Sequence, residues 1–211
     1  MGFSFLPIKY HPPFNSTITP DNVAEYSEEE ESYCLFRECG MEGIIDLDIF
    51  KKALNGFSRF HAAKRVIAIC DFTRPSNQDR FFVIDLDQSK LIVQSLVAHG
   101  KNSGLELAQS FSNQMQSLKS SLGFFRIGQK IKSPKHGDAL LLEGLEPGLN
   151  DQARQREIII HAADYVSQDY IKKNGRLGRS FGCPALPSDV LNPFYRSSNK
   201  ELCCIFMAKI Q

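Results

Sequence analysis

Hydrophobic residues in the first part of the chain recur at the spacing of an α-helix. The segment 21–40 predicts one helix, with Asp21 as the candidate N-cap and Gly40 as the residue that ends it. The segment 44–60 predicts a second, since its apolar residues follow a period of about 3.6 and acidic residues stand near its start. The acidic run at 27–32 is interpreted as a solvated face of the first helix. We expect both helices to cap the domain that follows.

From Arg65 onwards the pattern changes to short apolar runs, rich in β-branched residues, that are separated by turn residues. These runs predict strands at 66–70, 80–86, 90–98, 120–128, 139–142 and 201–207, with another inside the segment 156–166. Short helices are expected within 162–174 and 188–196, and an irregular loop at 105–119. This succession favours a mainly β fold, a sandwich or an open barrel with helices at its edge. We therefore divide the chain into an N-terminal extension with a helical segment, residues 1–62, and a β domain, residues 63–211.

The composition narrows the classes of function. The 211 residues are 42% hydrophobic and carry a formal net charge of +1, which leaves no strong field to attract nucleic acid or an anionic membrane. No apolar run approaches the length of about 18 residues that a membrane span needs. The start of the sequence does not resemble a signal peptide, so for an exported protein we expect the signal to have been removed. The six cysteines form no Cys-x-x-Cys pair, and a structural zinc site is not expected.

The segment 175–187 concentrates glycine, proline and arginine around one cysteine, Cys183. Its glycines allow a sharp turn in which backbone amides approach a substrate, and its prolines exclude a continuing helix. Arg176 and Arg179 would make the surroundings of the thiol electropositive, which lowers its pKa and favours the nucleophilic thiolate. Cys183 is therefore a candidate nucleophile. The alternative is a buried cysteine in a tight turn.

A histidine at the end of a predicted strand supplies a candidate partner. His161 follows the β-branched run 158–160 and precedes the cysteine segment by a short distance. A histidine in this position is a plausible general base for a thiol. A histidine that is hydrogen-bonded within the core is the alternative, and spacing alone does not decide between them.

Several ordered blocks accompany this pair: FVIDL at 82–86, VAHG at 97–100, SSLG at 120–123, HG at 136–137 and SFGC at 180–183. Together with His161 they resemble the L,D-transpeptidase catalytic domain of bacterial cell-wall enzymes, from about Arg65 to the end of the sequence. The similarity is greatest to the murein L,D-transpeptidase subfamily, in which proline follows the cysteine. The better-known branch has histidine before Gly-Cys and arginine two residues after the cysteine, where this chain has Phe181 and Ala185. The roles of those two side chains are therefore not carried over.

The resemblance implies a β-sandwich in which the cysteine loop and the histidine strand meet in a groove. It also implies an enzyme of the cell envelope, periplasmic or secreted, that acts on peptidoglycan stem tetrapeptides and needs no cofactor. Cys183, activated by His161, would form a thioester with the peptide. An amine would resolve it into an L,D cross-link, and water would resolve it as in an L,D-carboxypeptidase.

Further residues receive supporting roles in this interpretation. Backbone N–H groups around Gly182 and Cys183 would hold the oxyanion, and the hydroxyl of Ser180 would orient the site. Arg179 would bind a carboxylate or stabilise the thiolate, with surface solvation as the alternative. Substrate contacts are expected from His99, His136 and Tyr165, each of which has a plainer interpretation as a loop or helix-start residue. Tyr165 could instead orient His161.

Two other functions remain open from the sequence. One is a zinc-dependent peptidoglycan hydrolase, for which His99, His136, His161 and Asp164 supply ligand types without a close-spaced motif. The other is a cell-wall-binding domain that keeps the fold without turnover. We expect the thiol enzyme, because nucleophile and base both stand inside the ordered blocks.

Overall fold

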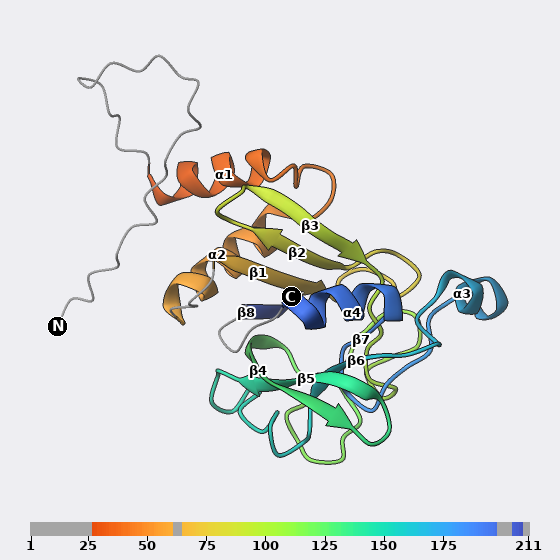
Figure 1. The fold of residues 1–211 in the computed structure, drawn as a ribbon. Helices are drawn as coiled ribbons and strands as arrows, with labels where there is room; N and C mark the ends of the chain where they lie inside the picture. The colour runs from red at the N-terminus through yellow and green to blue at the C-terminus, as the bar shows by residue number, and fades with distance from the viewer. Residues whose placement is uncertain (1–26, 61–64, 198–203, 209–211) are drawn as a thin grey trace, which may run out of the picture.

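The computed structural model describes residues 27–60, 65–197 and 204–208. Its helices are α1 (Glu28–Glu38), α2 (Leu47–Arg59), α3 (Gln168–Asn174) and α4 (Ser188–Ser197). Its strands are β1 (Val66–Asp71), β2 (Phe81–Asp85), β3 (Lys90–Ser95), β4 (Gly123–Ser133), β5 (Gly137–Gly144), β6 (Ile159–Ala162), β7 (Ala185–Leu186) and β8 (Cys204–Ala208). Figure 1 shows α1 and α2 at the end of the molecule that contains β1 to β3, with β4 and β5 at the opposite end.

The described strands form one sheet of eight, in the order β3-β2-β1-β8-β4-β5-β6-β7. β1 and β2 form the antiparallel hairpin that the sequence predicts. β8 pairs in parallel with β1 and antiparallel with β4, so it joins the two halves of the sheet. At one edge, β6 pairs in parallel with β7, and this pair adjoins the candidate catalytic residues.

Strands β1 and β2 are buried on both faces, which explains why their sequences are continuously apolar. One face, which includes Ile67 and Phe82, packs in the same cluster as α1 and α2. The other face, which includes Ala68 and Val83, shares a cluster with Leu140 of β5 and other residues of β4 to β6. Because one cluster joins residues from both halves, the halves of the sheet face each other around it. The prediction of a mainly β, sandwich-like fold is confirmed.

The two N-terminal helices begin at capping residues and pack closely on the sheet. Asp46 caps α2, where its side chain accepts a hydrogen bond from the backbone two residues on, at 2.8 Å. Gly56 lets α2 approach β4, since a Cβ placed there would lie 1.9 Å from the ring of Phe124. The start predicted for α1 is corrected: its N-cap is Ser27, which forms a capping box, while Asp21 lies outside the described residues.

Several predicted elements have different limits in the structure. The strand predicted at 90–98 ends at Ser95, because the chain then turns toward the cysteine loop, where Ala98 exchanges backbone hydrogen bonds of 2.8 and 3.3 Å with Ala185. β4 is longer than the predicted 120–128, and α3 starts only after its N-cap Ser167. The segment 105–119 is irregular, as predicted. Residues 201–203 of the closing strand lie outside the described part of the chain.

Three further expectations concern membrane spans, cysteine pairing and domain limits. Within the described residues, none of the helices combines the length and apolar character required to cross a membrane. The cysteines whose side chains are described, Cys34, Cys39, Cys70 and Cys183, are free thiols. The division of the chain at residue 62 stays a prediction, since residues 61–64 are not described.

Candidate active site

The cysteine turn, residues 180–183, is fixed by hydrogen bonds within itself. The hydroxyl of Ser180 donates to the carbonyl of Cys183 at 2.5 Å and accepts from the N–H of Gly182 at 3.1 Å. Gly182 has φ +128°, and a Cβ there would lie 2.9 Å from the carbonyl oxygen of Lys119, so the turn requires glycine. The Gly182 N–H is bound to Ser180, and the expected role of Gly182 in holding an oxyanion stays a prediction. Within the described residues, the N–H of Cys183 forms no hydrogen bond to another residue.

Neighbouring loops hold this turn in place. Ser120 is fully buried, and its hydroxyl accepts from the N–H of Gly100 and donates to the carbonyl of Gly182, both at 3.0 Å. Arg179 donates to the carbonyls of Lys101 and Gly104 at 3.0 and 3.1 Å. Arg179 thus fastens the loop after His99, and its expected binding of a carboxylate or stabilisation of the thiolate stays a prediction.

The parallel pairing of β6 and β7 brings the strand of His161 beside the cysteine turn. His161 is in register with Ala185, two residues after Cys183. Burial raises the pKa of Cys183, and the backbone N–H of Ile159, on the same strand as His161, opposes that increase. The sulfur of Cys183 lies 3.8 Å from the carbonyl oxygen of Glu157. Within the described part of the chain, thiol and imidazole lie in adjacent segments without a hydrogen bond between them.

His161 presents one ring nitrogen for chemistry. The side chain is 1% exposed, and Nδ1 lies 2.9 Å from the carbonyl oxygen of Ala162. A carbonyl accepts only, so we assign the proton to Nδ1, which leaves Nε2 as the basic nitrogen. Burial lowers the pKa of His161 to about 4, with smaller contributions from the charges of His136 and Lys135. The ring is therefore neutral near pH 7.

Two other predicted residues lie at this site. The ring of His136 stacks on His161, with centroids 3.8 Å apart and an angle of 27° between planes. Burial and then Lys135 lower the pKa of His136. Burial raises the pKa of Tyr165 to about 12, and the nearby charge of Cys183 contributes to the same shift. The structure thus brings His136 to His161 and Tyr165 to the vicinity of Cys183.

Arg156 is the cation beside the thiol, and the sequence did not reveal it. Burial raises the pKa of Cys183, and the positive charge of Arg156 opposes that increase. The guanidinium donates to the carbonyls of Ser112 and Lys119 at 2.7 and 2.6 Å, and to the hydroxyl of Ser121 at 2.5 Å. Arg156 lies 27 positions before Cys183 in the sequence, whereas the expected cations, Arg176 and Arg179, are its near neighbours. Only the packing of loop 112–121 places it there.

His99 does not occupy the expected substrate-contact position. It is fully buried, and its Nδ1 accepts a hydrogen bond from Arg80 at 2.8 Å, while Nε2 lies 3.4 Å from the carbonyl oxygen of Gly104. Burial and then the charge of Arg80 lower its pKa to about 4. Its contacts secure the loop that borders the cysteine turn, and the expectation of substrate contact is corrected.

The ligand set of the zinc alternative is not assembled. Both ring nitrogens of His99 are occupied, while His136 and His161 stack face to face. Asp164 is exposed. In the part of the chain that the structure describes, no three side chains of His, Cys, Asp or Glu converge as metal ligands would.

Comparison with known protein families identifies the family of the chain. Residues 42–207 match the family model described as the L,D-transpeptidase catalytic domain. The chain belongs to this L,D-transpeptidase family. The match contains the cysteine turn, β6 and helix α2, so part of the helical segment lies within the family's domain. Comparison with curated protein sequences gives no significant match.

Solved structures resemble this L,D-transpeptidase domain only distantly. An L,D-transpeptidase from Mycobacterium smegmatis is 13% identical with a TM-score of 0.43, and the match covers 69% of this chain and 59% of that one. The helical cell shape determining protein Pgp2 from Campylobacter jejuni is 17% identical with a TM-score of 0.41, covering 69% and 48%. The chain thus spans about half to three fifths of these solved chains. The family assignment rests on the family model and not on these likenesses.

The site of this L,D-transpeptidase domain combines a half-buried thiol, a neutral imidazole on the adjacent strand and a braced turn. Because the pKa of Cys183 is raised and that of His161 is lowered, both groups are uncharged near pH 7. The arrangement suits proton removal during nucleophilic attack better than a preformed thiolate–imidazolium pair.

Proposed function

We propose that the protein is a cysteine-dependent L,D-transpeptidase that acts on peptidoglycan stem tetrapeptides. The observation that supports this proposal is the parallel register of His161 with Ala185, which brings the strand of His161 beside the segment that contains Cys183. Family membership supplies the reaction class. We further propose that the protein works in the cell envelope, where this substrate is found.

In the proposed first half-reaction, the sulfur of Cys183 attacks the carbonyl carbon of the L-configured centre that is joined to D-alanine. Nε2 of His161 takes the thiol proton and delivers it to the departing nitrogen of D-alanine, which leaves a thioester. The N–H of Cys183, which forms no hydrogen bond to another described residue, donates to the developing oxyanion, a contribution of about 3 kcal/mol by comparison with measured oxyanion donors. The hydroxyl of Ser180 keeps the turn in the shape that this requires.

In the second half-reaction, a side-chain amine of another stem peptide attacks the thioester and restores the thiol. The product is an L,D cross-link. Water in place of the amine would give L,D-carboxypeptidase activity at the same site. His161 serves both variants, since either nucleophile must lose a proton as it attacks.

The proposal is tested by intact-mass analysis of the reduced protein after incubation with a disaccharide tetrapeptide or a carbapenem. We expect an adduct on the wild type, no adduct on Cys183→Ala, and slow adduct formation on His161→Ala. Cys70 provides a matched control, because it is fully buried and its pKa is raised to about 12. Cys70→Ala should therefore keep the adduct.

Two outcomes would contradict the proposal. A folded, reduced wild type that gives no adduct with either reagent would favour a cell-wall-binding domain. An adduct that survives in Cys183→Ala would place the nucleophile elsewhere. Circular dichroism of each variant verifies that a lost adduct does not reflect a lost fold.

A further inference from the structure

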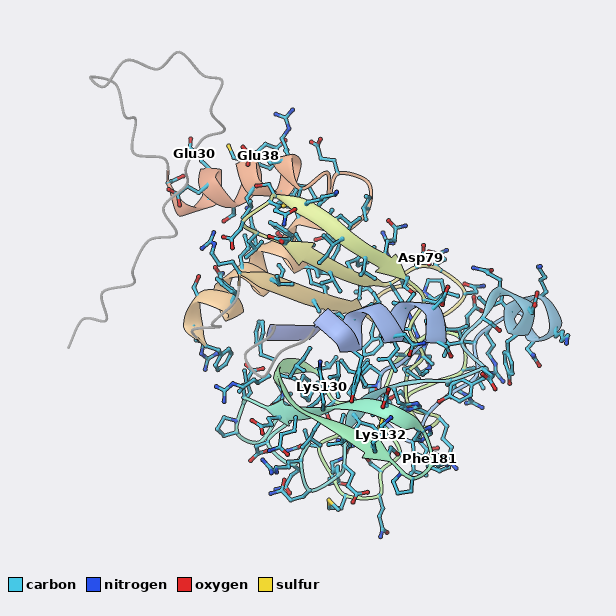
Figure 2. The ribbon with its side chains drawn as sticks, viewed as in Figure 1. Glu30, Glu38, Asp79, Lys130, Lys132 and Phe181 are labelled. Atoms are coloured by element: carbon cyan, nitrogen blue, oxygen red, sulfur yellow. The ribbon has the colours of Figure 1, made fainter. Side chains whose placement is uncertain are left out.

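Phe181 and two lysines form an exposed cluster next to the cysteine turn, which we call the Phe181 patch (Phe181, Lys101 and Lys135). The ring of Phe181 is 57% exposed. Nζ of Lys101 lies 4.8 Å from its centroid, and Nζ of Lys135 lies 4.7 Å from it. The patch therefore joins three segments: the loop after His99, the turn between β4 and β5, and the cysteine turn. Figure 2 shows Phe181 near the β4–β5 hairpin, far from Glu30 and Glu38 of α1.

The two ammonium groups of the patch carry uncompensated charge. Both lysines are exposed, and neither forms an ion pair within the described residues. Lys132 on the same hairpin differs, since its Nζ lies 2.6 Å from a carboxylate oxygen of Asp138. Each nitrogen of the patch is within 4.8 Å of one centroid, so the charges are separated by no more than about one Debye length, roughly 10 Å at 0.1 M salt. Their mutual repulsion is relieved when an anion binds.

The aromatic ring holds these charges in position. A lysine ammonium within about 6 Å of a ring centroid is attracted to the ring face, by about 0.5–1 kcal/mol at exposed sites. This attraction restrains two long side chains that would otherwise sample many rotamers. The patch is thus organised for an anion before the anion arrives.

The position of the patch connects it to the reacting groups. Phe181 stands two residues before Cys183, and Lys135 immediately precedes His136, whose ring stacks on His161. An anionic group held at the patch would therefore belong to the molecule that reaches the sulfur.

We propose that the Phe181 patch binds a carboxylate of the peptide on which Cys183 acts, and so makes the enzyme prefer a free carboxylate over an amide. The proposal rests on the proposed function, because it concerns the substrate of the same site. Two carboxylates of a stem tetrapeptide have this chemistry. One is the C-terminal carboxylate of the departing D-alanine, and the other is the side-chain carboxylate of the diamino acid.

The experiment compares three tetrapeptides: one with both carboxylates free, one with an amidated C-terminus and one with an amidated side-chain carboxyl. Acylation rates are followed by intact mass in the wild type, Lys101→Ala, Lys135→Ala and Phe181→Leu. We expect the wild type to prefer the free carboxylate by roughly 10-fold or more, as expected for a hydrogen bond to a charged group. Each variant should reduce that ratio toward one. If the wild type reacts more slowly with only one of the two amidated peptides, the carboxyl group amidated in that peptide is the one that the patch binds.

Lys132→Ala is the matched control, since it removes one positive charge from the same hairpin but not from the patch. It should retain the wild-type preference. Ratios that are unchanged in all three patch variants would overturn the proposal, as would an equal loss in Lys132→Ala.

A binding measurement separates this proposal from the proposed function. Peptide affinity for Cys183→Ala is measured with and without Lys101→Ala and Lys135→Ala, using the free and amidated peptides. A carboxylate preference that disappears with the lysines supports the patch even when the wild type forms no acyl-enzyme. Equal affinity for free and amidated peptides overturns the patch even when acylation occurs.

Discussion

His99 and His161 are alike in burial and in the direction of their pKa shifts, yet their ring nitrogens are used differently. Their side chains are 0% and 1% exposed, and burial lowers the pKa of each to about 4. Among the described residues, His99 has partners for both ring nitrogens, whereas His161 has a partner for Nδ1 alone. Burial and a shifted pKa therefore do not distinguish a structural histidine from a candidate base. The nitrogen that remains without a partner does.

An arginine lies near each of the two sites, Arg80 beside His99 and Arg156 beside Cys183. The two arginines differ in whether they bind the nearby histidine. Arg80 is fully buried and donates directly to His99 and to the carbonyls of Val97 and Arg74. Arg156 is half-buried, gathers loop 112–121 and lies close enough to Cys183 to affect its pKa. Arg80 thus occupies Nδ1 of His99. Arg156 lies near the thiol, and among the described residues it forms no hydrogen bond with His161, the proposed base.

The largest expected effect comes from replacing His161 or His99 by asparagine, one at a time. Asparagine at 161 keeps an amide donor near the position of Nδ1 and removes Nε2. We expect His161→Asn to lower the rate of Cys183 acylation by about 10²- to 10⁴-fold, the usual contribution of a general base. His99→Asn should instead lower the free energy of unfolding by about 1–3 kcal/mol, because buried partners lose a hydrogen bond. Acylation kinetics and urea unfolding of both variants measure the contrast, and identical profiles would refute it.

Next in size is the loss of Arg80. Arg80→Met leaves the carbonyl of Val97, the carbonyl of Arg74 and Nδ1 of His99 without their donor, and we expect a loss of about 3 kcal/mol in the free energy of unfolding. Arg37→Met is the control, since that arginine is 61% exposed and its contact with Glu42 is 3.5 Å long. Exposed ion pairs contribute about 0–1 kcal/mol. Equal losses in the two variants would contradict a structural role for Arg80.

Mild acid should lower the free energy of unfolding, because His99 and His161 are both buried with lowered pKa values. The pKa of each ring is lowered from 6.5 to about 4 in the folded state, so between these values the unfolded chain binds protons that the folded protein does not. The free energy of unfolding must then decrease as the pH falls from 6.5 toward 4. Between pH 7 and about pH 5.5 we expect a loss of roughly 1 kcal/mol per ring. His99→Asn should remove one such contribution, which urea unfolding at both pH values would detect. An unchanged pH slope would contradict the expectation.

The smallest effect concerns the charge near the thiol. Arg156→Met should raise the pKa of Cys183 further and slow its alkylation by iodoacetamide near pH 8 by several-fold, because only the thiolate reacts. Arg156→Lys keeps the charge and should lie closer to the wild type. The alkylation rate measured as a function of pH distinguishes a shifted pKa from a damaged site. A shifted pKa moves the midpoint of the profile and leaves the limiting rate at high pH unchanged. A midpoint that is the same in all three proteins would exclude an electrostatic role.

Local sequence pattern predicted the elements whose environment is uniform along them. β1 and β2 are buried on both faces, and their continuous apolar runs reveal this directly. Helix α2 was predicted because its apolar face follows the helical period and Asp46 marks its start. The end of the third strand at Ser95 was not predicted, since apolar residues continue to Ala98 but pair with Ala185 in a different part of the sheet.

The candidate site was predicted only as far as its motifs extend. Cys183 and His161 lie in adjacent segments, as expected, and Ser180 bonds within its own turn. The different states of His99 and His161 depend on whether an arginine 19 residues away points at the ring, which spacing does not encode. The same applies to Arg156, whose neighbours come from a loop without regular structure. Sequence pattern therefore identified the candidate residues, whereas the side chains that modulate them are identified only in the structure.

The position of β8 has a consequence for how the molecule is made. β8 follows every other described strand in the sequence, yet it lies between β1 and β4 near the middle of the sheet. A ribosome builds the chain from its N-terminus. The helical half and the half that bears Cys183 are therefore both complete before the strand that binds them together emerges. The pairing of β8 with both halves can therefore form only when synthesis has passed residue 208.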